Sequence, residues 1–287
     1  MRNGRAVFEQ QARRLEARRP IPHSTFRIPH SPCGWHRSVS CVHMPRPSSP
    51  RARKPQGAQA FTRRLIAWFE RHGRDLPWRR TRDPYRVLVS EFMLQQTQVS
   101  RVAQYYPRFL KRFSSLEELA DAKPKAVRES WEGLGYYARA SSLQAVAKTV
   151  RRKDGKIPSD PEELVKLPGV GPYTAGAVAS FAYEKPVPAV DTNVTRVLRR
   201  VFIGDSGRRA SGVGRGKDIW DLARALVPKS GKRAWTFNQA VMELGALVCK
   251  ARKPLCPECP VSISCRWRSA ALRSRPGRAG SRRVARP

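Results

Sequence analysis

The chain has 287 residues, and its 57 Lys and Arg against 22 Asp and Glu give a formal net charge of +35 at pH 7. So large an excess of positive charge favours a polyanionic partner and carries no information about the fold. No apolar run approaches the ~20 residues of a membrane span and no basic amphipathic helix stands out, so we predict a nucleic-acid partner and no membrane partner.

The two ends of the chain differ in composition from its middle. Residues 1–60 hold twelve Arg or Lys but only two Glu, and they lack the apolar periodicity of a folded segment. We predict a disordered basic extension over 1–60 and a disordered basic tail over 266–287. A start codon assigned too early, with Met44 as the true start, or an Arg-rich transit peptide would also explain residues 1–60. We expect a cytoplasmic, nucleoid-associated bacterial protein, with an organellar or nuclear one as the alternative.

Most histidines and two cysteines gather in the first of these segments. They are His23, His30, Cys33, His36, Cys41 and His43. Their spacing fits no standard set of metal ligands, so disorder remains our interpretation of this segment.

Residues 61–265 follow a helical period almost throughout. Apolar residues recur at helix spacing in FTRRLIAWFERHG (61–73), RVAQYYPRFLKRF (101–113), KAVRESWEGL (125–134) and ARASSLQAVAKTV (138–150). No run of alternating residues indicates a sheet, and Pro or Gly breaks separate the helices. The region therefore predicts an all-α fold, with room for one large or two small domains.

The stretch LPGVGPYTAG (167–176) predicts a tight connection between two helices. Together with PEELVKL before it, it forms a helix-hairpin-helix over 161–184, with Pro172 at the first position of the second helix. Gly169 and Gly171 can adopt backbone angles closed to other residues and let another backbone approach. The unpaired amides that follow suit a phosphate. A plain helix connection is the alternative, and the basic composition favours the phosphate.

The last cysteines give the most specific pattern. Cys249, Cys256, Cys259 and Cys265 follow the spacing C-x6-C-x2-C-x5-C. A large chain without a secretion signal is a poor candidate for disulfides, and zinc sites usually contain two close cysteine pairs. We favour a structural four-iron, four-sulfur cluster over zinc. Lys250, Arg252 and Lys253 lie between the first two ligands and would form a basic, phosphate-binding loop.

These motifs together resemble the endonuclease III superfamily of DNA glycosylases. The hairpin, the aspartate in PAVDTNV (188–194) and the cysteine spacing carry the resemblance, which covers residues 61–265. LPWRRTRDPY (76–85), SEFMLQQTQV (90–99) and GLGYYARA (133–140) resemble its MutY branch, which removes adenine opposite 8-oxoguanine or guanine.

The resemblance implies a monomeric, two-domain base excision repair enzyme that acts on double-stranded DNA. A six-helix barrel would span 84–189 and contain the hairpin. A cluster domain would combine 61–83 with 190–265. The target adenine would flip into the cleft between the domains.

Tyr173 follows the hairpin, where the endonuclease III branch carries a lysine that attacks the sugar. A neutral phenol forms no Schiff base, so we predict a monofunctional enzyme in which water is the acceptor. Tyrosine also occurs here in the related thymine–guanine mismatch glycosylases, which act on thymine or uracil opposite guanine. They are the second interpretation, and LQQTQ (94–98) favours adenine.

Two carboxyl groups fit the chemistry that the resemblance implies. Glu91 lies on the apolar side of a predicted helix, where desolvation would raise its pKa and suit it to protonate adenine N7. Asp191 precedes a predicted helix, and as its N-cap it would stay ionised and stabilise the cationic sugar. Alternatively, Glu91 would be a buried acid with all its hydrogen bonds formed, and Asp191 would be a purely structural cap.

Other site residues follow only from the resemblance. It places Trp78, Arg79, Glu243 and Asn193 at the adenine pocket, and Gln96, Thr97, Leu134 and Tyr136 against the duplex near the orphaned base. On composition alone, Trp78 and Leu134 would be core residues and Glu243 would lie on a solvated helix face.

The sequence also departs from the family pattern. It ends soon after Cys265, where most MutY proteins have a second domain that recognises 8-oxoguanine, and Asp191-Thr192-Asn193 replaces the commoner Asp-Gly-Asn. A non-catalytic DNA-binding module and a bifunctional glycosylase/lyase remain as alternatives. The pair of Glu91 and Asp191 argues against the first, and Tyr173 argues against the second.

Overall fold

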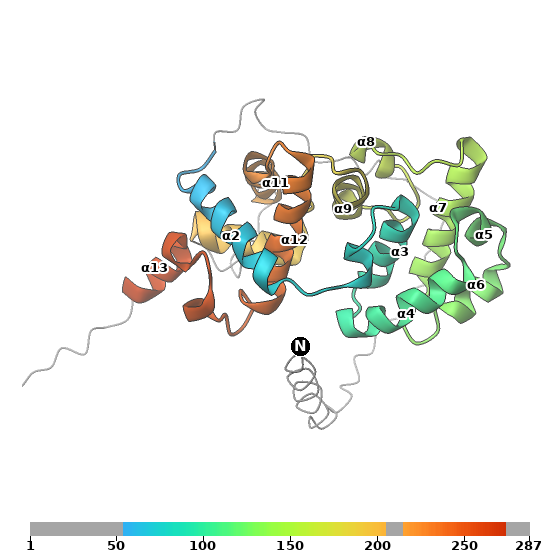
Figure 1. Ribbon diagram of the computed structural model, residues 1–287, viewed down its shortest axis with the longest axis horizontal. Coiled ribbons are helices and arrows are strands. Elements are labelled where there is room, and N and C mark those ends of the chain that lie inside the picture. Colours follow the sequence, from blue (N-terminus) through green and yellow to red (C-terminus); the bar gives the residue numbers. More distant parts are fainter. Residues whose placement is uncertain (1–53, 205–214, 274–287) are drawn as a thin grey trace, which may run out of the picture. The chain divides into compact units, whose positions relative to one another are not determined.

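The computed structural model describes residues 54–204 and 215–273 (Figure 1). The helices are α2 (Ala58–His72), α3 (Pro84–Leu94), α4 (Val99–Arg112), α5 (Leu116–Asp121), α6 (Pro124–Ser130), α7 (Ala138–Lys153), α8 (Pro161–Leu164), α9 (Pro172–Tyr183), α10 (Thr192–Leu198), α11 (Arg215–Leu226), α12 (Gly231–Leu247) and α13 (Arg266–Arg273). Short helical turns are η1 (Pro77–Arg79), η2 (Arg199–Ile203), η3 (Cys256–Glu258) and η4 (Ser262–Ser264). Over these two ranges the chain forms no strand, which confirms the prediction of an all-α fold.

The starts of several helices follow from local sequence. Asp83 and Asp160 each precede a proline at the first helical position, and each accepts a hydrogen bond from a backbone amide of its helix. At α5, the Ser115 hydroxyl accepts from the Glu118 amide, while the Glu118 carboxylate accepts from the amide of Ser114. This reciprocal pair resembles a capping box, shifted by one residue on the carboxylate side.

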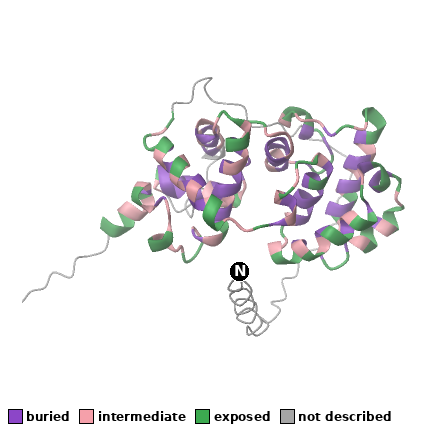
Figure 2. Cartoon of the chain, in the orientation of Figure 1, coloured by how far each residue is buried: buried purple, intermediate pink, exposed green. Residues whose placement is uncertain are grey.

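The described residues form two hydrophobic cores (Figure 2). The first contains apolar side chains between Leu76 and Ala189, and Trp131, Phe92 and Phe109 are its largest fully buried members. The second combines α2 with the segment from Val190 to Cys265, and α2 packs on α12. The first core comes from one continuous stretch of sequence, whereas the second is built from two separate stretches of the chain. The assignment of domains to 61–83 plus 190–265 and to 84–189 stays a prediction.

The predicted disordered ends need a correction where the structure describes them. Helix α2 begins at Ala58, which is buried in the second core, so the folded part starts before residue 61. Residues 266–273 form α13 rather than a disordered tail. Trp267 packs against the second core, and the Arg200 guanidinium carbon lies 4.9 Å from the centroid of the Trp267 ring. These contacts explain why residues 266–273 are ordered. The histidine and cysteine positions between 23 and 43 lie outside the described residues.

No helix in the described ranges is long and apolar enough to cross a membrane.

Candidate active site

Glu91 occupies the buried side of α3. The residue is 3 % exposed, and its Oε2 atom has no hydrogen-bond partner within the described residues. Burial disfavours the carboxylate and raises the pKa of Glu91 to about 7, although an interaction with the Tyr173 hydroxyl and the charge of Arg79 lower it. The burial and the raised pKa that the sequence predicts are therefore confirmed. The group can hold a proton near neutral pH and donate it.

Asp191 caps the N-terminus of α10, as the sequence predicts. Its Oδ1 accepts from the Val194 amide at 2.7 Å, and its Oδ2 accepts from the Asn193 side-chain amide at 2.8 Å. Burial raises the pKa of Asp191, although these hydrogen bonds and Arg196 oppose the rise. The cap hydrogen bonds thus favour the ionised form that the sequence predicts, but burial outweighs their effect on the pKa. At Glu91, by contrast, one carboxyl oxygen is left without any donor.

Close backbone contacts position the segment that leads to Asp191. A Cβ atom at Gly176 would lie 2.3 Å from the carbonyl oxygen of Pro188, so only glycine lets α9 approach so closely. The buried Asn238 side chain donates to the Val187 carbonyl at 2.9 Å and accepts from the Ala189 amide at 3.3 Å. These contacts pack α9, α12 and residues 187–189, which precede Asp191, against one another.

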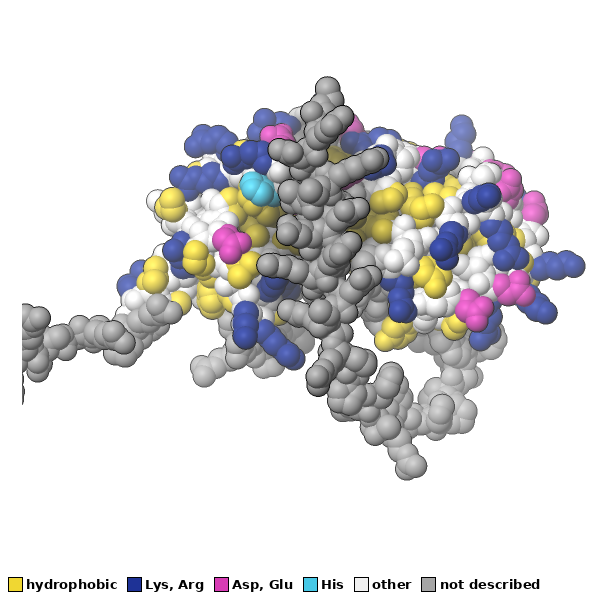
Figure 3. All heavy atoms as spheres, turned by 60° about the horizontal axis from the view of Figure 1, so that its bottom comes forward, with side chains coloured by type: hydrophobic (Ala, Val, Ile, Leu, Met, Phe, Trp, Pro, Cys, Tyr) yellow, Lys and Arg dark blue, Asp and Glu magenta, His cyan; other side chains and the backbone are white. Residues whose placement is uncertain are grey.

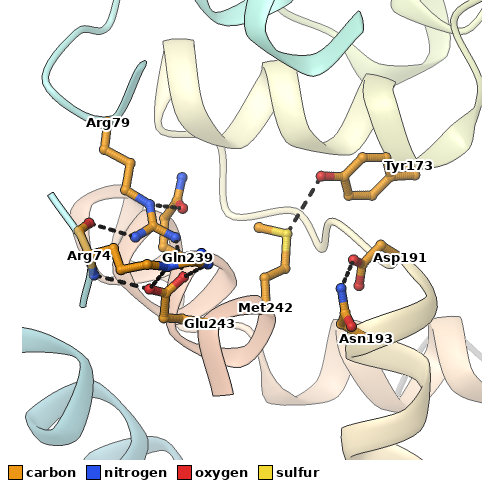
Figure 4. A network of polar contacts seen from close by, with 8 residues as sticks. All are labelled: Arg74, Arg79, Tyr173, Asp191, Asn193, Gln239, Met242 and Glu243. Atoms are coloured by element: carbon orange, nitrogen blue, oxygen red, sulfur yellow. Dashed lines mark hydrogen bonds and ion pairs between the residues drawn. The ribbon is translucent and has the colours of Figure 1, made fainter. Parts of the chain in front are cut away.

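Tyr173 lies in the first turn of α9, and its side chain is half-buried. Its hydroxyl donates to the Met242 sulfur at 3.5 Å (Figure 4). Burial and the nearby carboxyl groups of Glu91 and Asp191 hold the pKa of Tyr173 well above its usual value. The phenol is therefore neutral at physiological pH, and it lies beside both predicted catalytic carboxyl groups.

A second polar group surrounds Glu243 on α12 (Figure 4). The carboxylate accepts from Arg74 Nε at 2.7 Å and Nη2 at 2.9 Å, and from Arg79 Nη2 at 2.8 Å. Arg79 also donates to Gln239 Oε1 at 2.8 Å. Burial favours the neutral acid, but these hydrogen bonds outweigh it and lower the pKa of Glu243 to about 2.

Glu243 is thus a buried, ionised carboxylate, with 1 % of its side chain exposed, and not part of a solvated helix face. Because its pKa is so low, Glu243 holds no proton to donate near neutral pH, whereas Glu91 can hold one. Arg79 links the two groups, since it bonds Glu243 and its charge also acts on Glu91. Trp78 is 7 % exposed and packs edge-on against Tyr106, so it belongs to the first core.

The residues predicted to contact the duplex lie on two loops. Gln96 and Thr97 belong to the first loop (residues 95–98, between α3 and α4), and Leu134 and Tyr136 to the second loop (residues 131–137, between α6 and α7). Gln96 is exposed and Tyr136 is 64 % exposed, so both are available for contact. Leu134 is 5 % exposed and packs in the first core, in agreement with the alternative interpretation from composition.

The hairpin connects α8 and α9. Gly169 has φ +72, and a Cβ there would lie 2.8 Å from the Cβ of Ser142, so this position requires glycine. Gly171 has φ −88, which any residue adopts, so the predicted need for unusual backbone angles is wrong at this residue. Nothing lies within 4 Å of a Cβ at Gly171. The start of α9 is therefore open to a second molecule.

The four cysteines of the C-terminal motif line one small cavity. Cys249, Cys256, Cys259 and Cys265 are all free thiols, and they share this cavity with apolar side chains such as Val261 and Leu255. No three His, Cys, Asp or Glu side chains in the described parts of the chain are placed to hold a metal ion together. The donor set is nevertheless the one that iron–sulfur clusters use.

Two arginines hold the segment that begins at Cys249. Arg200 Nη1 donates to the Cys249 sulfur at 3.3 Å and to the Lys250 carbonyl at 2.8 Å, and its Nη2 donates to Ala251 at 2.9 Å. Arg196 Nε donates to the Cys249 carbonyl at 2.8 Å. Three basic side chains of this segment are exposed, namely those of Lys250, Arg252 and Lys253. Figure 3 shows many Lys and Arg side chains on one face of the molecule and fewer Asp and Glu.

The fold and the site agree with a sequence match to a known family. Residues 89–237 match the HhH-GPD superfamily of base excision DNA repair proteins. The chain belongs to this superfamily.

Several known proteins are similar to most of this chain. An adenine DNA glycosylase of Rattus norvegicus is 46 % identical over 217 residues, which are 72 % of this chain and 41 % of that protein. An adenine DNA glycosylase of Mycolicibacterium smegmatis is 45 % identical over 210 residues, 72 % of this chain and 69 % of that protein. The chain therefore spans about two-fifths of the rat protein. The solved structure of a thermostable thymine-DNA glycosylase has a TM-score of 0.68 and 30 % identity, covering 75 % of this chain and 98 % of the other.

Sequence reasoning missed several residues of this site. They are Arg74 and Gln239 in the network around Glu243, Asn238 beside the approach to Asp191, Met242 under Tyr173, and Arg139 between the two loops. Local sequence held no signal for Arg74 or Arg139, since each is one arginine among many. A polar side chain on the apolar face of α12 was the available signal for Asn238 and Gln239.

Proposed function

We propose that this chain is a monofunctional DNA glycosylase that removes adenine opposite 8-oxoguanine or guanine in double-stranded DNA. The observation that supports this most is Glu91, a buried carboxyl group with a pKa of about 7 and one unpaired oxygen. The names of the rat and mycobacterial relatives support adenine as the base.

Glu91 would act first, as the general acid. Adenine leaves readily only when it is protonated, and a carboxyl group that holds its proton near neutral pH can supply that proton to N7. Loss of the base leaves a sugar with the character of an oxocarbenium ion. Asp191, held by its own helix cap and by Asn193, would stabilise that cation electrostatically. Water then completes the hydrolysis.

Tyr173 supports a monofunctional reaction. A lyase step needs an amine that forms a Schiff base with the sugar. The side chain at this position is a neutral phenol, and its contacts with Met242 and Glu91 support a role in positioning the acid. The DNA strand would therefore stay intact after the base has left.

The chemistry of the four thiols that line this cavity suits a four-iron, four-sulfur cluster, which Cys249, Cys256, Cys259 and Cys265 would hold. When bound, the cluster would contribute structure and no step of the hydrolysis. The segment around it would present Lys250, Arg252 and Lys253 to DNA phosphates, and the open start of α9 at Gly171 would receive another phosphate.

A thymine–guanine mismatch glycosylase is the second candidate, supported by the structural similarity to the thermostable enzyme of that name. Single-turnover base release from A:8-oxoguanine, A:G, T:G and U:G duplexes separates the two. Release of adenine alone from the first two supports the proposal. Release of thymine or uracil, with adenine retained, would replace it by the second candidate.

A further inference from the structure

The first loop and the second loop each contain an exposed residue in an unusual backbone conformation. Gln96 has φ +55 and Tyr136 has φ +47, and Glu184 is the one other residue besides glycine with positive φ in the described ranges. A residue with a Cβ atom rarely adopts the left-handed conformation, and it stays there only where the surrounding structure enforces it. Some feature of the structure must therefore hold these two loops in place.

Arg139 provides that constraint from the first turn of α7. Its guanidinium donates to acceptors on both loops and on the end of α3. These are the carbonyls of Phe92 at 2.9 Å, Met93 at 2.8 Å and Gln95, the Thr97 hydroxyl at 3.0 Å, and the carbonyls of Leu134 at 3.2 Å, Gly135 at 3.0 Å and Tyr136 at 3.4 Å. The side chain is 8 % exposed. One arginine thus joins the residues that flank both Gln96 and Tyr136.

The charge of Arg139 suits this location. The last carbonyls of a helix lack partners within the helix and carry a partial negative charge. Phe92 and Met93 lie in the last turn of α3, so the guanidinium satisfies carbonyls at the end where a cation is favoured. Its own helix, α7, starts beside it and gives no such benefit, since a helix N-terminus repels a cation.

Two aromatic rings also lie near the Arg139 guanidinium. The guanidinium carbon lies 5.5 Å from the centroid of the Trp131 ring and 5.7 Å from that of Tyr136. The Tyr136 ring is therefore restrained by the same side chain that binds its backbone carbonyl. Burial lowers the pKa of Arg139, but an arginine remains charged in proteins.

We propose that Arg139 is a positioning residue, which holds Gln96 and Tyr136 in the arrangement that keeps an opened base pair apart. The inference rests on the proposed function, because it assumes that the adenine leaves the duplex before it reacts. It also assigns this arginine a role other than binding phosphate. The acceptors that the described residues give it are backbone carbonyls and one hydroxyl, and they use its whole guanidinium.

The test compares Arg139→Met and Arg139→Lys with Gln144→Met. Gln144 is a matched control, since it lies on α7, is 5 % exposed, and donates to the carbonyls of Leu119 at 3.2 Å and Ala122 at 2.7 Å, away from both loops. Lysine keeps the positive charge of Arg139, but its single ammonium group cannot bridge the two loops. Arg139→Lys therefore replaces Arg139→Met in the test if the Met variant does not fold.

Each protein is tested on two duplexes, one with adenine opposite 8-oxoguanine and one with the adenine bulged and already unpaired. We expect the Arg139 variants to lose about tenfold to a hundredfold in single-turnover rate on the paired adenine, and less than about threefold on the bulged one. Gln144→Met should change both rates equally. The slope of log Kd against log salt concentration should stay at the wild-type value, because Arg139 contacts no phosphate.

Equal losses on the two duplexes, or a salt slope that falls by about one, would overturn the role of Arg139. A wild-type protein that releases adenine from neither duplex would instead refute the proposed function. The two failures are therefore distinguishable in one set of measurements.

Discussion

Gly245 on α12 packs directly against Asn193 on α10. A Cβ atom at Gly245 would lie 2.6 Å from the Cβ of Asn193 and 3.2 Å from its carbonyl oxygen. Asn193 in turn donates to the Asp191 carboxylate. The close packing of α12 on α10 therefore helps to fix the position of the Asp191 carboxyl group, for which we propose a catalytic role.

We expect Gly245→Ala to lower the rate of base removal although alanine is the better helix former. The added methyl group must push α10 away, and overpacking of this kind costs about 1–3 kcal/mol. Because the displacement falls on Asn193 and Asp191, single-turnover rates should fall more than duplex affinity does. An alanine variant with wild-type rates would show that α10 tolerates the shift.

The hairpin allows a paired test with two glycines. Gly171→Ala should leave thermal stability unchanged or slightly higher, since φ −88 suits alanine and no atom lies within 4 Å of the new methyl group. Duplex affinity should nevertheless fall, because the methyl group meets the DNA backbone. Gly169→Ala should lose stability as well, since φ is +72 and Ser142 is 2.8 Å away. Wild-type affinity in Gly171→Ala would contradict DNA contact at this hairpin.

Local features of the site could be predicted from sequence, and its contacts between distant segments could not. The cap of Asp191 depends on residues within one turn, and the burial of Glu91 follows from the apolar side of a single helix. Glu243 was different, because its burial depends on Arg74 and Arg79 far away in the chain. Without those two partners, a solvated carboxylate is the reasonable expectation.

The same distinction applies to the fold. Helical periodicity gave the all-α class, and the hairpin followed from its Pro and Gly residues. The order of residues 266–273 was missed because it depends on the packing of Trp267 against Arg200, a contact that no local pattern reveals. The constraint at Arg139 was missed for a related reason, since backbone carbonyls carry no sequence signal.

The cysteine cavity leads to a prediction about the cofactor. Purified protein should be yellow-brown and contain iron and acid-labile sulfide, because four thiolates in one segment suit a four-iron, four-sulfur cluster. Cys256→Ser should weaken duplex binding or folding more than it slows base release from bound duplex, since the cluster would support the basic segment. A matched control is Ser262→Ala in the same region, which keeps all four ligands. A colourless, fully active protein that contains zinc would refute the cluster.

Tyr173 provides a test of the monofunctional reaction. The wild type should release the base and leave the strand intact until alkali is added, since the phenol forms no Schiff base. Tyr173→Lys places an amine at the start of α9, beside Glu91 and Asp191. This variant should gain some strand cleavage and form a DNA adduct that borohydride traps. Abundant adduct with the wild-type protein would exclude a monofunctional mechanism.

Glu91 gives the most specific prediction, because its pKa of about 7 affects both activity and stability. Glu91→Gln should abolish base removal and leave duplex binding nearly intact, since glutamine keeps the shape but donates no acidic proton. In the wild type, the rate should fall about tenfold per pH unit above the pKa, as the carboxyl group loses its proton.

The free energy of unfolding changes with pH in the opposite direction to that expected for a carboxyl group in an ion pair. An unperturbed glutamate has a pKa of 4.5, and burial raises that of Glu91 to about 7 in the folded chain. Between these values the unfolded chain ionises first, so this group lowers the free energy of unfolding as pH rises, by about 3 kcal/mol in total. Glu91→Gln should remove that dependence, and its stability should exceed that of the wild type above pH 7. Unfolding by urea at several pH values measures the difference, and parallel pH profiles for the two proteins would show that Glu91 is not the buried acid.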